Sequence, residues 1–279
     1  GTGPVTGEAL GLHDKVDVVA FTGSDEIGRQ FLNYSARSNM KRIWLECGGK
    51  SPQIVDRDCP DLDSAAEAIA YGIWYNQGET CHAGSRLIVH PDVKEALLSR
   101  LERWAEHFEP RDPLDATTAM GPLVDADQCQ VVLGYIDGAR RSGARIRVGG
   151  ERADDESGGF FVRPTIIDGL AHDAPAMREE IFGPVLVVQD CADLDHAIAL
   201  ANDTRYGLAA AVWTNRVAEA HSAAAALRAG TVWVNCYDQA SPATPFGGFK
   251  ESGIGRDRSL HAFDKFTEIK TTWVDLSTA

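Results

Sequence analysis

The chain has 279 residues, of which 44% are apolar and 24% are charged, and its net charge at pH 7 is −14. This composition is ordinary for a globular protein of one large or two smaller domains, and the acidic charge without a basic stripe excludes a nucleic-acid partner. No apolar run is long enough for a membrane helix and no signal peptide is apparent, so we expect a cytoplasmic protein. The cysteines and histidines form no CxxC or HxxxH pattern, so we expect no metal site.

Apolar, β-branched runs alternate with helical periodicity along most of the chain. In chain order, the pattern predicts a strand at 16–21, a helix capped by Ser24 or Asp25, strands at 42–46 and 53–55, a helix at 62–75, a strand at 86–89, and helices at 93–107 and 128–142. Strands follow at 144–148, 160–165 and 185–189, then a helix at 194–202, a strand at 209–213, a helix at 218–228 and a strand at 231–235. This alternation predicts an α/β fold with helices on both faces of a sheet.

Two segments of the chain interrupt or end this alternation. The polar run 151–159 predicts a surface loop. Residues 267–274 alternate Thr, Ile and Trp with polar residues, which predicts a terminal strand that either caps its own sheet or extends a neighbour's edge.

Two residues are candidates for catalysis. Cys81 lies in a polar turn with flanking glycines, whose N–H groups could stabilise an oxyanion; the alternative is a buried or incidental thiol. Glu46 ends a predicted strand just before Gly48 and Gly49, where a carboxylate could act as a general base; the alternative is a solvated surface residue.

Three further segments are compatible with a binding site. The turn at 22–28 could offer backbone amides and a helix N-terminus to a pyrophosphate, although it is not a GxGxxG motif. Residues 179–184 could be a helix end that enters a strand, and the aromatic loop 245–250 could line or fill a pocket.

Together and in this order, these segments resemble the aldehyde dehydrogenase superfamily. The resemblance covers essentially all of residues 1–274, and its matching pieces are FTGS (21–24), LECGGKSP (45–52), NQGETCHAGSR (76–86), EEIFGPV (179–185), NDTRYGLAAAV (202–212), GTVWVNCYD (230–238) and PFGGFKESGIGRD (245–257). Residues 39–51 and 255–273 are most similar to dehydrogenases of γ-glutamyl-γ-aminobutyraldehyde and related aminoaldehydes.

The resemblance implies a three-layer α/β architecture. Residues 1–48 would form the second part of a Rossmann-like NAD(P)-binding domain whose N-terminal part is absent, 49–251 the catalytic domain, and 252–279 a return segment with an oligomerisation strand. Homodimers or homotetramers would be built on that strand.

The resemblance also implies NAD(P)-dependent oxidation of an aldehyde to a carboxylic acid. Cys81 would attack the aldehyde to give a thiohemiacetal and then a thioester, Glu46 would activate the hydrolytic water, and Asp257 would occupy a secondary acidic position of a proton relay. The cofactor, NAD with NADP not excluded, would be bound by Gly3, Gly23, Ser24, Ile27, Gly28, Gly48, Glu180 and Phe182. Asp238 and Phe246 would line the aldehyde tunnel.

The chain departs from the family pattern in two ways. Residues 238–242 are small and polar where many relatives carry a bulky aromatic residue, which favours an amine- or amide-bearing aldehyde over a small aliphatic one. The long N-terminal stretch of the family is absent, and with it an oxyanion-hole asparagine, so we expect this chain to be inactive alone and the intact protein to be an enzyme.

Two other functions compete with this interpretation. A non-catalytic binding or assembly module would fit the missing N-terminal stretch, but Cys81, Glu46 and Glu180 are all retained. A CoA-acylating relative would need a thioester that resists water, against which Glu46 argues.

Overall fold

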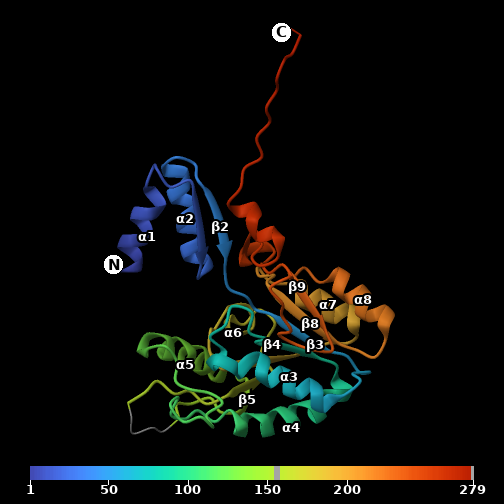
Figure 1. Cartoon of the computed structure of the whole chain (residues 1–279). Coiled ribbons are helices and arrows are strands. Elements are labelled where there is room, and N and C mark those ends of the chain that lie inside the picture. The colour runs from blue at the N-terminus through green and yellow to red at the C-terminus, as the bar shows by residue number, and fades with distance from the viewer. Residues whose placement is uncertain (154–157, 278–279) are drawn as a thin grey trace.

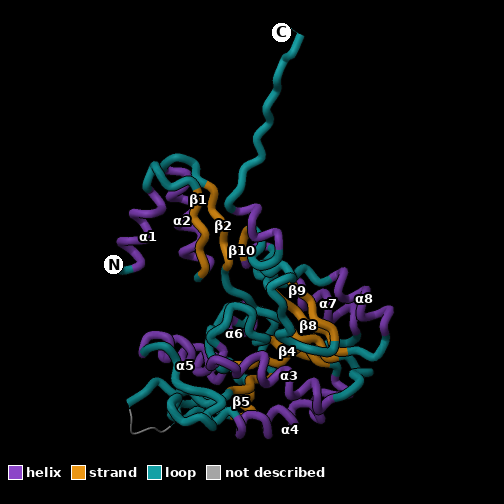
Figure 2. Tube along the Cα trace, viewed as in Figure 1, coloured by secondary structure: helices purple, strands orange, loops and turns teal. Residues whose placement is uncertain are grey.

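The computed structural model describes residues 1–153 and 158–277. The centre of the predicted loop 151–159 and the last two residues of the predicted segment 252–279 therefore lie outside the described residues. The chain forms two sheets, a three-stranded one with the order β1-β2-β10 and a seven-stranded one with the order β5-β6-β7-β4-β3-β8-β9. Figure 2 shows the two groups of strands in separate parts of the molecule, and the predicted α/β class is confirmed.

The small sheet begins with a β-α-β unit. Strands β1 (Val18–Thr22) and β2 (Arg42–Glu46) are parallel and flank α2 (Asp25–Arg37), while β10 (Gly253–Ile254) returns antiparallel to the end of β2. The Ser24 hydroxyl caps α2 by accepting a bond from the N–H of Ile27 at 3.3 Å. Helix α1 (Gly3–Leu12) lies against α2, where a Cβ on Gly11 would come within 2.6 Å of the Tyr34 ring.

The large sheet carries most of the fold. Its strands are parallel except for β5, which is antiparallel to β6; they are β3 (Pro52–Val55), β4 (Arg86–Val89), β5 (Arg145–Val148), β6 (Thr165–Asp168), β7 (Val185–Asp190), β8 (Ala209–Trp213) and β9 (Thr231–Val234). Such sheets are buried on both faces, which explains why β3, β4, β6 and β8 are completely buried.

Helices cover both faces of the large sheet, as Figure 1 shows. One face packs against α3 (Leu62–Trp74) and α4 (Pro91–His107), and the other against α5 (Ala126–Arg141), α6 (Pro175–Arg178), α7 (Leu194–Asn202) and α8 (Val217–Ala226). Neighbouring strand residues point to opposite faces, so that Val55 joins the α3 and α4 core while Ile54 joins the α7 and α8 core. This arrangement gives the expected three layers.

Most predicted elements are present, but two strands differ. The strand predicted at 160–165 is wrong: residues 161–162 are buried with only an isolated bridge from Val162 to Arg152, and β6 begins after Pro164, which has no N–H to donate. The strand predicted at 267–274 is also not formed in this chain, because its backbone has no hydrogen-bonding strand beside it and extends from the body (Figure 1). Helix α1 was not predicted.

Four short elements complete the described chain: three 3-10 helices, η1 (Tyr75–Gly78), η2 (Lys250–Ser252) and η3 (Leu260–Lys265), and the two-residue strand β10. Among the helices of the described residues, none combines the length and apolar character required to cross a bilayer.

Candidate functional site

The turn that carries Cys81 depends on left-handed backbone. Residues 76–78 of η1 all have positive φ, and a Cβ on Gly78 would lie 2.2 Å from the carbonyl oxygen of Gly183. Glycine is therefore required there. The turn closes with a bond from the N–H of Ala83 to the carbonyl of Thr80 at 3.0 Å, and it leaves Cys81 partly exposed ahead of β4.

The two glycines after β2 lie between Cys81 and Glu180. The N–H of Gly49 donates to Oε1 of Glu180 at 3.1 Å, and a Cβ on Gly49 would come within 2.8 Å of the carbonyl oxygen of Cys81. On Gly48, a Cβ would lie 1.9 Å from Oε2 of Glu180. Because Glu180 and the backbone of Cys81 both lie so close to these residues, neither Gly48 nor Gly49 could carry a side chain. The predicted cysteine and the predicted ribose-binding carboxylate therefore meet at this short segment.

Glu46 lies two residues before Gly48 and has an unusual environment for a carboxyl group. Its side chain is buried, and neither carboxyl oxygen has a hydrogen-bond partner among the described residues. Burial, followed by the charge of Asp257, raises the pKa of Glu46 to about 7, although Lys265 and nearby arginines oppose the shift. Near neutral pH this carboxyl can therefore both hold and release a proton, as a general base must.

Asp257 is held near Glu46 from two directions. Its backbone exchanges two hydrogen bonds with Phe246, with its N–H donating at 2.6 Å and its carbonyl accepting at 2.8 Å. Its carboxylate forms an ion pair with the buried ammonium group of Lys265, whose own carbonyl accepts a bond from the indole N–H of Trp44 at 3.1 Å. Lys265 was not predicted, because it lies in the separate 3-10 helix η3.

His82, which the sequence did not single out, connects Cys81 with the predicted substrate residues. Its Nδ1 lies 3.8 Å from the Sγ of Cys81, and its Nε2 lies 2.9 Å from Oδ1 of Asp238. The imidazole also makes an edge contact with the Phe246 ring at 5.8 Å between centroids. The only sequence signal was a histidine directly after the candidate cysteine, since Asp238 is 156 residues away.

Four of the predicted cofactor residues line one cavity. Gly3, Gly23, Ser24 and Ile27 border a space of about 860 Å³ between α1, the end of β1 and the start of α2. Gly28 does not line this cavity: it packs against the Sγ of buried Cys47, which would be 3.1 Å from a Cβ at that position.

The last two predicted cofactor residues, Glu180 and Phe182, are separated in the chain by one residue. Burial raises the pKa of Glu180 to about 7, against the opposing bond from Gly49 and the charge of Lys50. Phe182 has a left-handed backbone with φ of 55° and a partly exposed ring, and Nε2 of Gln128 donates to its carbonyl at 2.8 Å.

Lys50 is a further group that sequence reasoning missed. Its side chain is completely buried, its Nζ has no hydrogen-bond partner among the described residues, and burial lowers its pKa to about 7. The motif LECGGKSP contained this lysine, but nothing in the spacing indicated that it would be buried next to Glu180.

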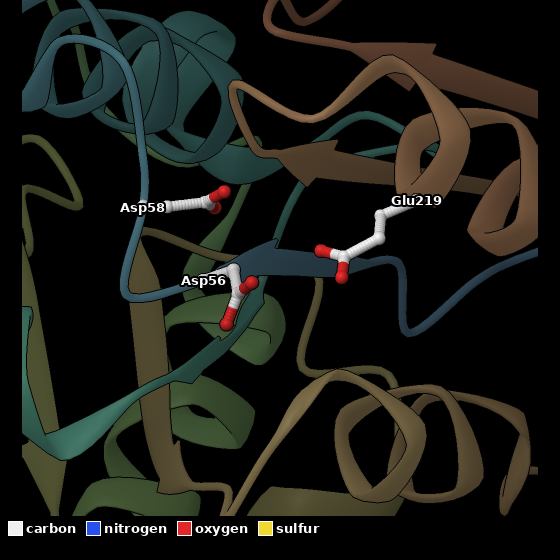
Figure 3. A group of neighbouring side chains, drawn as sticks. All are labelled: Asp56, Asp58 and Glu219. Carbon is white, nitrogen blue, oxygen red and sulfur yellow. The ribbon is translucent and has the colours of Figure 1, made fainter.

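A group of three carboxylates lies elsewhere, at the end of β3 and the start of α8. Asp56, Asp58 and Glu219 point toward a common space (Figure 3). The guanidinium of Arg216 binds all three, at 3.3 Å, 2.7 Å and 2.6 Å respectively. Arg216 therefore offsets part of the negative charge of the cluster, and the ion pairs join the segment after β3 to α8.

Comparison with known proteins identifies the family. The family model described as "Aldehyde dehydrogenase family" matches residues 1–272. Aminoacetaldehyde dehydrogenase of Pseudomonas aeruginosa is 47% identical over 278 residues, which is 99% of this chain and 55% of that protein. The NADP/NAD-dependent aldehyde dehydrogenase PuuC of Escherichia coli is 45% identical, with the same coverage of each chain.

Solved structures agree with this comparison. The gamma-glutamyl-gamma-aminobutyraldehyde dehydrogenase of Burkholderia cenocepacia superposes with a TM-score of 0.93 at 53% identity, over 95% of this chain and 54% of that one. An indole-3-acetaldehyde dehydrogenase solved with NAD⁺ superposes with a TM-score of 0.97 at 52% identity, over 99% and 56%. The chain thus spans about half the length of the curated relatives that it matches.

Proposed function

Because the chain belongs to the aldehyde dehydrogenase family, we propose that the intact protein oxidises an aldehyde to a carboxylic acid with NAD or NADP and with Cys81 as its nucleophile. The activity is proposed for the intact protein, since the relatives are nearly twice as long as this chain. One observation carries the proposal: Gly48 and Gly49 lie between Glu180 and the backbone of Cys81, and Gly48 is two residues after the buried carboxyl Glu46.

The cofactor is proposed to occupy the cavity beside α1 and to reach Glu180. Gly3, Gly23, Ser24 and Ile27 leave space for a nucleotide next to the N-terminus of α2, where unpaired N–H groups favour phosphate. Asp25 in the first turn would repel an anion, but Arg205 pairs with it at 3.3 Å. When bound, NAD(P)⁺ supplies the hydride acceptor.

The other cofactor contacts are proposed around Glu180, away from the cavity beside α1. Glu180 has a second carboxyl oxygen beyond the one that Gly49 uses, and this oxygen suits a ribose hydroxyl. Gly48 would allow the close approach of Glu180, Phe182 would pack beside the nicotinamide ring, and Gly28 would act indirectly by letting α2 lie against Cys47.

The chemistry is proposed to take place on Cys81. Its sulfur would attack the aldehyde carbonyl to form a thiohemiacetal, whose oxyanion the N–H of Cys81 would stabilise, and oxidation would leave a thioester. Glu46 would then take a proton from water, which attacks the thioester and releases the acid. A pKa of about 7 suits this role, because at neutral pH part of the carboxyl is ionised and the carboxylate is still basic enough to take a proton from water. Asp257 would accept that proton in turn.

We propose the same domain assignment as the resemblance implied. Residues 1–48, which hold β1 and β2, would belong to the cofactor domain, 49–251 would form the catalytic domain, and 252–279 would return to β2 through β10. Several large apolar side chains of the last segment are strongly exposed: Leu260, Phe263, Phe266, Ile269, Trp273, Val274 and Leu276. This exposure supports pairing with a second copy of the chain.

The proposed substrate class is an aldehyde that carries an amine or amide. The support is the name of two similar proteins, aminoacetaldehyde dehydrogenase and gamma-glutamyl-gamma-aminobutyraldehyde dehydrogenase. Asp238 is about half exposed and binds His82 through only one carboxylate oxygen, so the other oxygen can accept a bond from an amine.

Rapid-mixing kinetics of the intact protein test the mechanism. Glu46→Gln should give one burst of NADH per active site and then a steady rate lowered roughly a hundred-fold, because the thioester forms but is not hydrolysed. Mass spectrometry should find the acyl group on Cys81. Cys81→Ser should lose the burst, whereas Cys59→Ser, a control at another partly exposed thiol, should keep it. Full oxidation by Cys81→Ser would refute the proposal.

Substrate competition tests the second part. We expect a higher kcat/KM for an aminoaldehyde than for acetaldehyde, and Asp238→Asn should reduce this preference. A preference for acetaldehyde over γ-glutamyl-γ-aminobutyraldehyde in the unmodified protein would overturn the substrate class while leaving the role of Cys81 intact.

A further inference from the structure

Cys81, His82 and Asp238 are connected in one line of polar contacts. The Sγ of Cys81 lies 3.8 Å from Nδ1 of His82, and Nε2 of His82 lies 2.9 Å from Oδ1 of Asp238. An ionised carboxylate only accepts hydrogen bonds, so Nε2 must carry a proton, and in a neutral imidazole the Nδ1 lone pair then faces the thiol. This is the order of groups that activates a cysteine through a histidine and an orienting acid.

The histidine is held in this position from several sides. The rings of Phe246 and Trp233 contact the imidazole at 5.8 Å and 6.3 Å between centroids. The hydroxyl of buried Tyr237 donates to the carbonyl of His82 at 2.5 Å. With its ring packed and its Nε2 bonded, His82 is fixed toward the sulfur rather than free to turn into solvent.

The acid is also fixed by its backbone. Asp238 has a φ of 57°, in the left-handed region that aspartate enters more readily than most residues. The indole N–H of Trp233 donates to the carbonyl of Gln239 at 2.9 Å, which ties down the residue that follows Asp238. The loop therefore presents its carboxylate to His82.

We propose that His82 is a catalytic residue that takes the proton of the Cys81 thiol and holds the resulting thiolate beside its imidazolium, with Asp238 as the positioning residue. The proposal rests on the proposed role of Cys81 as the nucleophile. The S–H bond of Cys81 breaks and the Nδ1–H bond of His82 forms, so the pair gains no net charge and needs no other reactant. The thiolate then attacks the carbonyl carbon, and it is regenerated when water cleaves the thioester.

The charges around His82 favour its protonated form. Burial lowers its pKa, but the hydrogen bonds with Asp238 and Cys81 outweigh burial and raise the pKa to about 9. Two neighbouring groups are also titratable or charged. Burial raises the pKa of Tyr237, so it stays neutral, and the guanidinium of Arg258 lies 5.0 Å from the centroid of the Phe246 ring. Once the proton has passed from Cys81 to Nδ1 of His82, the imidazolium that results is therefore stable at neutral pH.

This assignment gives the site two bases with separate tasks. His82 contacts the sulfur and would act before the aldehyde is attacked. Glu46, whose pKa is raised to about 7, would act on water after the thioester has formed. If Glu46 also ionised the thiol, replacing it would slow both steps, and the two assignments can therefore be separated by experiment.

The test is the pH dependence of Cys81 alkylation in the intact protein without cofactor, with iodoacetamide as the probe and peptide mass spectrometry as the readout. His82→Gln places an amide near Asp238 but has no Nδ1 acceptor beside the sulfur. We expect it to lower the alkylation rate of Cys81 at pH 6.5 by about ten-fold or more, with recovery above pH 9, because a thiolate paired with histidine forms at lower pH than an unpaired one. Asp238→Asn should lower the rate in the same pH range by a smaller factor.

Two controls make the result specific. His261→Asn removes a histidine that pairs with Asp264 on the exposed surface, at 3.3 Å, and should leave the profile unchanged. Glu46→Gln should keep the Cys81 alkylation profile while blocking thioester hydrolysis. Circular dichroism should first show that His82→Gln and Asp238→Asn are folded. The proposal is wrong if these folded variants keep the pH profile of Cys81 alkylation seen in the original protein. It is also wrong if only Glu46→Gln abolishes the fast alkylation of Cys81. Its failure is distinct from that of the proposed function, which the NADH burst measures.

Discussion

Replacing Glu46 by glutamine would measure what it costs the fold to keep a carboxyl buried at the end of β2. Burial and the charge of Asp257 raise the pKa of Glu46 from 4.5 to about 7. Between these pH values the folded protein holds a proton that the unfolded chain has lost, so folding takes up a proton and stability falls as the pH rises. This direction is the reverse of that for a salt-bridged carboxylate.

The magnitude follows from the size of the shift. Each pKa unit corresponds to about 1.4 kcal/mol, so the ionised carboxyl lowers the free energy of unfolding by about 3 kcal/mol above pH 7 and by about 1 kcal/mol at pH 5. Glutamine does not ionise. The difference in stability between Glu46→Gln and the original protein should therefore grow by about 2 kcal/mol between pH 5 and pH 8, whatever constant energy the buried amide adds.

Thermal unfolding of the intact protein at several pH values provides the assay. In domains of 150–250 residues 1 kcal/mol changes Tm by about 2–4 °C, so the Tm difference should grow by roughly 4–8 °C in favour of the variant from pH 5 to pH 8. The matched control is Glu67→Gln on the exposed face of α3, which removes a solvent-exposed carboxylate of the same kind. Parallel Tm curves for Glu46→Gln and the original protein would refute the reasoning, because they would mean that Glu46 is already ionised at pH 5.

Three glycine substitutions give further predictions. Gly48→Ala should displace the Glu180 carboxylate, which lies 1.9 Å from the new Cβ, and weaken NAD⁺ binding by about ten-fold or more in a fluorescence titration; unchanged affinity would contradict the role of Glu180. Gly230→Ala would place its Cβ 1.6 Å from the carbonyl oxygen of Gly247, so it should lower the free energy of unfolding by roughly 3 kcal/mol or more. Gly134 lies in α5 with open space around it, so Gly134→Ala should raise the free energy of unfolding by about 0.5–1 kcal/mol. If Gly230→Ala and Gly134→Ala changed the free energy of unfolding in the same direction, the packing argument would be wrong.

The regular part of the fold was predictable because its signals are local. The bounds of β2, β4, α7 and β8 agree with the predicted ranges to the residue. These segments have strong apolar runs or clear helical periodicity, and β4 and β8 belong to the large sheet, which is buried on both faces. Helix α1 lacked such a signal, since glycines at 3, 7 and 11 weaken helix propensity. Gly11 is useful only in the folded protein, where the Tyr34 ring of α2 packs against it.

The site was predictable only in part, because its contacts join distant segments. The family motifs identified Cys81, Glu46 and Glu180, and the structure brings the segments of all three together at Gly48 and Gly49. No spacing rule could pair His82 with Asp238, or Asp257 with Lys265 in a separate helix, since both pairs depend on how loops pack after the sheets form.

Because β10 pairs with β2 but comes much later in the chain, the small sheet can be completed only late in synthesis. Glu46 pairs with Gly253, so the ribosome must add roughly 200 residues after β2 before its second edge can be closed. During that interval the backbone N–H and C=O groups on one edge of β2 are unpaired and can pair with a strand of another chain. We therefore expect chains stalled before residue 253 to aggregate or bind chaperones, and the buried environment of Glu46 to be among the last parts of the protein to form.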